Sequence, residues 1–154
     1  MNVEYINPFI ESLDNFFKVK LKSMVQRGDV GVSKGEVNVR DFCAYLGYNG
    51  SVQGIVTILI PVNTALKIAS VFEKQQIVVV DDTVTTHLAN MVQAIAILAK
   101  SSFPDAGTGI KATNAVVCRA SEFIEKYPGG VWLQMPFETD FGDLILRVSL
   151  KSAE

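Results

Sequence analysis

Apolar and polar residues recur along this chain with two periods, one typical of helices and one typical of strands. The clearest helical pattern covers residues 81–103, where apolar positions return every three or four residues. The recurring positions are Val84, Leu88, Met91, Ile95, Leu98 or Ala99, and Ser102. We expect Asp82 to be the N-cap, and Pro104 prevents clean continuation. The pattern therefore predicts one long helix with one buried face.

A second column of residues runs beside the buried stripe of this predicted helix. At about 100° per residue, its members are Thr83, His87, Asn90, Ala94 and Ile97. The column begins with polar side chains and ends with small and apolar ones. Such a strip can contact a partner protein while presenting two hydrogen-bonding side chains to it.

Two further helices and several strands follow from the rest of the pattern. Helices are predicted over residues 6–22 and over roughly residues 64–74, the second capped by Asn63. Strands are predicted over residues 24–33, 37–48, 52–60, 113–119, 131–138 and 143–150. Residues 77–80 are either a brief strand or an apolar lead into the long helix, and residues 121–127 a helical turn.

The turn signals join most of these strands without an intervening helix. Asn49-Gly50 is a strong hairpin signal, and the string TDFG separates the last two strands. Pro136 predicts an edge or a bulge in the strand that contains it. The sequence therefore predicts one α+β domain over residues 1–154, with a two-layer arrangement of a mainly antiparallel sheet packed by about three helices.

Composition and charge narrow the range of functions. Apolar residues make up 49% of the chain and charged residues 19%, which suggests a buried partner surface. The net charge of −2 and the lack of basic runs argue against nucleic-acid and membrane-surface binding. The first residues have no secretory-signal pattern, and the apolar runs fall short of the roughly 20 residues that span a bilayer. We therefore expect a cytoplasmic protein.

Several local strings, in this order of elements, resemble those of one protein family. The string TTHLANM runs from Thr85 to Met91 and is followed by Ala94, and the closing run LQMPFETDFGDLILRVSL covers residues 133–150. The YNG turn and the string NTALKIASVF also fit. The chain resembles the CheX/CheC family of chemotaxis proteins, and CheX more than CheC. The resemblance covers nearly the whole sequence.

The resemblance implies a reaction and a partner. Family members remove the phosphoryl group from the aspartate of a CheY-like response regulator. A helix reading acidic-x-x-Gly-Glu-x-x-Asn-Met enters the regulator's site, where the amide positions water and the glutamate pairs with a lysine. Asn90 matches the amide, whereas His87 stands where the glutamate is expected, and Thr86 and Ala94 replace glycines. The resemblance also implies a homodimer and no cofactor of its own, because the magnesium ion would belong to the receiver.

The residues themselves leave alternatives open. His87 is also compatible with a solvated or locally bonded histidine, and Asn90 with an ordinary surface amide. The changes at Thr86, His87 and Ala94 are also compatible with a catalytically impaired module that binds a receiver or dimerises in bacterial signalling. A metal site is not predicted, because the chain has a single histidine and the two cysteines, Cys43 and Cys118, lack ligand spacing. Both cysteines are expected to be small buried hydrophobes.

Overall fold

The computed structural model describes residues 3–33, 37–104 and 109–152. The helices of this part of the chain are η1 (Val3–Tyr5, a 3₁₀ turn), α1 (Ile6–Lys20), α2 (Val62–Glu73), α3 (Asp82–Lys100) and α4 (Ala120–Lys126). The strands are β1 (Val25–Arg27), β2 (Gly31–Ser33), β3 (Phe42–Gly50), β4 (Val52–Ile60), β5 (Ile110–Ala112), β6 (Val116–Arg119), β7 (Trp132–Thr139) and β8 (Gly142–Ser152).

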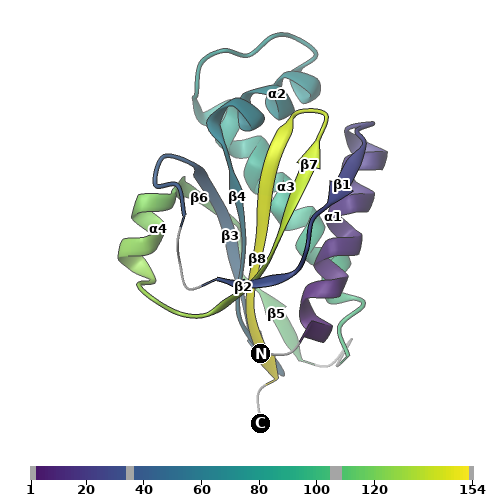
Figure 1. The fold of residues 1–154 in the computed structure, drawn as a ribbon, viewed down its shortest axis with the longest axis vertical. Helices are drawn as coiled ribbons and strands as arrows, with labels where there is room; N and C mark the ends of the chain where they lie inside the picture. The colour runs from purple at the N-terminus through teal and green to yellow at the C-terminus, as the bar shows by residue number, and fades with distance from the viewer. Residues whose placement is uncertain (1–2, 34–36, 105–108, 153–154) are drawn as a thin grey trace.

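The described strands form one antiparallel sheet (Figure 1). Its order is β1-β7-β8-β4-β3-β5, with β2 also paired to β7 and β6 also paired to β3. Both predicted hairpins are present, β3 with β4 and β7 with β8. Gly50 has a φ of 103°, a left-handed conformation that glycine adopts without steric cost, which explains the Asn-Gly turn signal. The predicted α+β fold is therefore confirmed.

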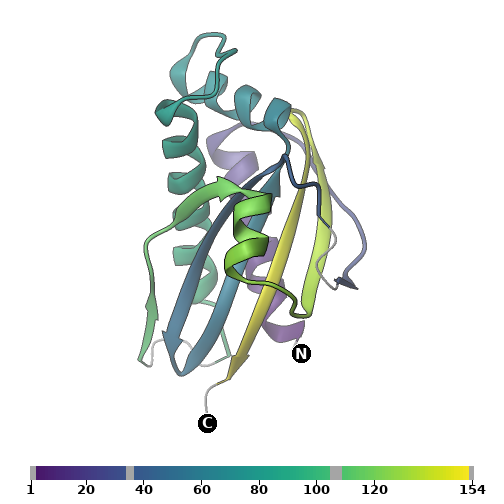
Figure 2. The same ribbon diagram turned by 90° about the vertical axis from the view of Figure 1, so that its left-hand side faces the viewer.

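The helices cover the two faces of the sheet unequally. The side chains of α1, α2 and α3 join the main core on one face, while Phe123 of α4 packs in a smaller cluster with Cys43 and Trp132. Figure 2 shows α4 and the two long helices on opposite sides of the sheet. The two-layer expectation therefore holds for the main core, and α4 adds a partial layer on the other face.

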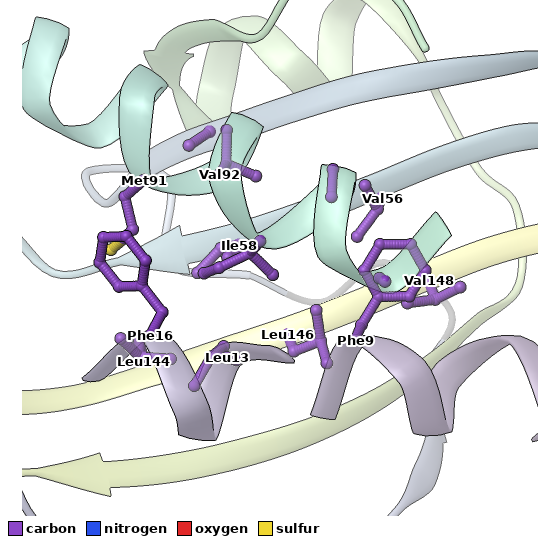
Figure 3. Close-up of a cluster of buried hydrophobic side chains, with 14 of the residues drawn as sticks. Phe9, Leu13, Phe16, Val56, Ile58, Met91, Val92, Leu144, Leu146 and Val148 are labelled. Carbon is purple, nitrogen blue, oxygen red and sulfur yellow. The ribbon is translucent and has the colours of Figure 1, made fainter. Parts of the chain in front are cut away.

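The main core is built from helix stripes that meet the alternating apolar residues of the central strands. Figure 3 shows Phe9 and Leu13 of α1 and Met91 of α3 in the same layer of side chains as Ile58 of β4 and Leu146 of β8. Each of these side chains is at most 1% exposed. The predicted stripe of the long helix is buried from Val84 to Ala99, because burial of its apolar face against the sheet is favourable. Of the two alternatives at its end, Ala99 is buried and Leu98 is exposed, and Ser102 lies exposed beyond the last helical residue, Lys100.

Two helix starts differ from the prediction. The carboxylate Oδ1 of Asp81 accepts hydrogen bonds from the backbone N–H of Thr83 at 3.0 Å and of Val84 at 3.3 Å. Asp81 is therefore the N-cap of α3, and the prediction of Asp82 was wrong by one residue. The helix α2 begins at Val62 after Pro61, so Asn63 lies inside its first turn and does not cap it.

The predicted strand over residues 24–33 is interrupted in the middle. It forms β1 and β2, which both pair with β7. At Gly28, between them, a Cβ atom would lie 2.6 Å from Cγ of Pro136, so a larger residue would not fit. The Gly28 N–H donates to the Pro136 carbonyl at 2.8 Å. Pro136 thus lies opposite a break in its neighbour, as its missing N–H requires.

The remaining differences from the prediction concern where elements begin and which short elements form. The structure begins β3 at Phe42 and β6 at Val116, both later than predicted, and residues 77–80 form a lead into α3 and no strand. The short strand β5 was not predicted. Residues 121–127, expected to be a helical turn, belong mostly to α4.

Stability should depend on the residues that join the helices to the sheet. Leu146 is fully buried, so Leu146→Ala should lower the free energy of unfolding by about 2–5 kcal/mol through lost contacts and a residual cavity. Leu98→Ala is the matched control, because Leu98 is 46% exposed and should cost less than about 1 kcal/mol. Chemical denaturation followed by circular dichroism measures both. Equal losses in the two variants would contradict this description of the core.

Candidate functional site

The helix α3 presents its second column of residues along a flank that the sheet does not cover. Val84 and Leu88 point into the core and are fully buried, whereas Asn90 is exposed. Thr83 is half-buried at the start of the column, and Thr86 beside it is exposed. The amide of Asn90 is thus held on a rigid helix and directed outward.

Asn90 is available to an external ligand or partner. Among the residues that the structure describes, none forms a hydrogen bond with its side chain. A primary amide has two N–H donors and one carbonyl acceptor, so it can bind a water molecule in a defined orientation. The site can therefore orient a water molecule at the surface of α3.

His87 lies one turn before Asn90 and is held in place by α2. Its Nε2 lies 2.6 Å from Oε2 of Glu73, the last residue of α2. Its ring stacks on Phe72, with the ring centroids 5.0 Å apart and the planes 13° apart. Because a carboxylate only accepts hydrogen bonds, the proton of this contact lies on Nε2. His87 therefore has a fixed ring orientation and a fixed position for one proton.

Glu73 is the site residue that the sequence prediction missed. Its side chain is 34% exposed, so the carboxylate lies beside His87 while part of it still faces solvent. Lys74 follows with a φ of 57° and a left-handed conformation that ends α2 at this point. A carboxylate thus lies next to position 87, and it comes from another helix. Glu73 and His87 lie 14 residues apart, and no periodic pattern within one helix links them.

The other end of the column borders an apolar groove between α1 and α3. The groove has a volume of about 280 Å³ and includes Phe16, Val19, Ala94 and Ile97 in its lining. Val19 and Ile97 are 52% and 60% exposed. The predicted transition of the column from polar to apolar is therefore present in the structure. Whether Thr83, Thr86, Ala94 and Ile97 bind a partner stays a prediction.

The described residues contain no group of three or more histidine, cysteine, aspartate or glutamate side chains arranged to hold a metal ion. Within the same residues, none of the helices combines the length and apolar character needed to cross a membrane.

Comparison with solved structures finds the same fold in chemotaxis proteins. A CheC-like superfamily protein from Shewanella sp. PV-4 has a TM-score of 0.82 and 21% identity over 99% of this chain and 100% of its own. CheX from Vibrio vulnificus has a TM-score of 0.80 and 20% identity over 96% and 99%. A CheX–CheY–BeF₃–Mg²⁺ complex from Borrelia burgdorferi contains a match with a TM-score of 0.80 and 19% identity over 98% and 100%.

Sequence comparison alone does not find these relations. The chain matches no family model and no curated protein. The shared features are therefore the order of elements, the antiparallel sheet and the position of the long helices, at an identity near 20%. The chain has the fold of the CheX/CheC-like chemotaxis proteins.

Proposed function

We propose that this protein acts on a CheY-type response regulator and removes the phosphoryl group from its aspartyl phosphate, with Asn90 positioning the attacking water. The observation that carries the proposal is the outward amide of Asn90 on α3, in a fold shared with CheX proteins. One solved structure with this fold is a complex of CheX with CheY. The family resemblance of the string TTHLANM assigns Asn90 the same role.

The proposed reaction requires few contributions from the phosphatase itself. An aspartyl phosphate is a reactive acyl phosphate, and the receiver brings the magnesium ion that balances the phosphoryl charge. The phosphatase then contributes orientation, by holding a water molecule in line with the phosphorus. The Nδ2–H of Asn90 donates to the water oxygen while Oδ1 accepts one of its protons. No cofactor of its own is required in this scheme.

We further propose that Glu73 supplies the carboxylate that position 87 lacks. In the family resemblance, a glutamate on the signature helix pairs with a lysine of the receiver. Here the Glu73 carboxylate lies beside that position, held by the His87 Nε2 at 2.6 Å. One oxygen accepts from His87, and the other remains available for an ammonium group. In this proposal, the single glutamate that the family carries on the signature helix is replaced by two residues, Glu73 on α2 and His87 on α3.

The apolar groove continues this surface away from Asn90. The exposed side chains of Val19 and Ile97 provide apolar area beside the polar end of the column. A receiver whose acidic pocket encloses Asn90 would extend over this groove, because both lie along the same flank of α3. The groove would then contribute binding area, and the polar end would contribute the chemistry.

The amide of Asn90 is the first element to test. Added to phosphorylated CheY-type receivers with magnesium, the protein should accelerate phosphate loss, and Asn90→Ala should reduce this acceleration by about 100-fold. Asn63→Ala, a change at another exposed helical asparagine, is the matched control and should retain the activity. Phosphate release measured over time compares the wild type with the two variants. If the wild type left the decay rate of every cognate receiver unchanged, phosphatase activity would be excluded.

The carboxylate of Glu73 is the second element to test. Glu73→Gln should lower kcat/KM by about 2- to 5-fold, the range for a partly exposed charge pair. His87→Glu alone would place two carboxylates side by side, which repel each other. The double variant His87→Glu with Glu73→Gln moves the single carboxylate onto α3 and should restore the activity.

The control for this test is Glu125→Gln, a neutralised glutamate on α4 at the opposite face. It should leave kcat/KM unchanged. If Glu73→Gln and Glu125→Gln behave alike while Asn90→Ala is inactive, Glu73 has no role and the water-positioning proposal survives. The two proposals are therefore separable.

A second function, a binding module without catalysis, is favoured by one observation. The Nε2 of His87 is already bonded within the chain, and its ring is stacked on Phe72. This arrangement is compatible with a residue that only stabilises the contact of α2 with α3. The module would bind a receiver without accelerating phosphate loss, which calorimetric titration with phosphorylated and unphosphorylated receivers detects. The homodimer and the cytoplasmic location also stay predictions.

A further inference from the structure

The two cysteines of the chain lie opposite each other on neighbouring strands. Cys43 in β3 and Cys118 in β6 are direct partners in the antiparallel register. The Cα atoms of such partners are about 4.5–5.5 Å apart, within the range of about 4.4–6.8 Å that a disulfide requires. As direct partners, the two residues direct their side chains to the same face of the sheet. The register therefore places the two residues at a backbone separation that a disulfide can span.

The two thiols differ in their access to solvent. Cys43 is fully buried, whereas Cys118 is half-buried and lines a surface depression of about 470 Å³ together with Val116 and Glu122. An oxidant can thus reach Cys118 from outside, while Cys43 is protected by Cys118 and the sheet. This arrangement is typical of a reactive cysteine with a resolving cysteine behind it.

The surroundings also favour Cys118 as the reactive thiol. Interaction with the Cys43 thiol lowers the pKa of the Cys118 thiol, whereas interaction with Cys118 and burial raise the pKa of the Cys43 thiol. The ammonium group of Lys126 acts in the same direction on Cys118, while Glu122 opposes it. The buried guanidinium of Arg147 acts in the opposite direction and lowers the pKa of the Cys43 thiol, but the interaction with Cys118 and burial outweigh it. A thiolate is the nucleophilic form of cysteine.

We propose that Cys43 and Cys118 are a reversible redox site that hydrogen peroxide converts to a disulfide between β3 and β6. The Cys118 thiol loses its proton, and the thiolate attacks one oxygen of the peroxide. The O–O bond breaks, a sulfenic acid forms on Cys118, and the leaving hydroxide takes up the proton to become water. The Cys43 thiol then attacks the sulfenic sulfur, forms the S–S bond and releases a second water molecule. Two thiols are oxidised and one peroxide is reduced. A dithiol reductant reverses the reaction by exchange.

The disulfide would link β6 covalently to β3. The strand β6 pairs with β3 and is followed directly by α4. The covalent link closes a long loop that contains β4, α2 and α3, and such closure removes conformations from the unfolded chain. The oxidised protein should therefore have a melting temperature higher by about 5–15 °C.

The test uses the wild-type chain in the reduced state, treated with a few equivalents of hydrogen peroxide. We expect both thiols to disappear, the intact mass to fall by two hydrogen atoms, and peptide mapping to join Cys43 to Cys118 in the monomeric chain. Dithiothreitol should restore both thiols and the original melting temperature. Persistence of both free thiols, or products that are only intermolecular disulfides or sulfonic acids, would overturn the proposal.

Single variants assign the roles of the two thiols. Cys43→Ala should leave a sulfenic acid at Cys118 that dimedone traps, whereas Cys118→Ser should leave Cys43 unlabelled because it is buried. Circular dichroism before oxidation shows that each variant is folded. Equal dimedone labelling of the two variants would contradict the order of attack, and the wild-type mapping remains decisive if either variant fails to fold.

Discussion

The rotation of α3 about its own axis is the constraint on which the candidate site depends. Val84, Leu88, Met91 and Ile95 are each at most 1% exposed and hold the helix against the sheet. A turn of one residue, about 100°, would carry this stripe into solvent at a cost of about 1.5–3 kcal/mol for each side chain. Asn90 therefore points outward because other residues of its helix are buried, and it needs no contact of its own to do so.

The same constraint explains why much of the site could be predicted from the sequence. The apolar residues of α3 recur at helical spacing because they form its buried face. Their spacing therefore predicts both the helix and the outward direction of Asn90. The position of the cap was harder, because Asp81 and Asp82 have the same side chain. Only the extended backbone of Asp81, with φ −146° and ψ −171°, distinguishes the residue before the helix from the first one within it.

The Glu73–His87 contact could not have been predicted in this way. It joins the last residue of α2 to the flank of α3, and its geometry depends on how the two helices pack. The short strand β5 was missed for a related reason, since its three residues are too few to show a period. The identity of residue 87 gives no sign of a carboxylate at this point of the surface. The packing of the two helices places the Glu73 carboxylate beside it.

The strand β3 separates the two chemistries of the molecule. Its residues alternate in direction, so Ala44 and Leu46 support the face of α3, while Cys43 lies in the cluster beneath α4. Gln93 of α3 is joined to the segment just before β6, because its Oε1 accepts a hydrogen bond from the Ala115 N–H at 2.8 Å. A bridge in β6 would restrain this segment without changing the buried stripe of α3. The core would thus keep Asn90 outward in either redox state.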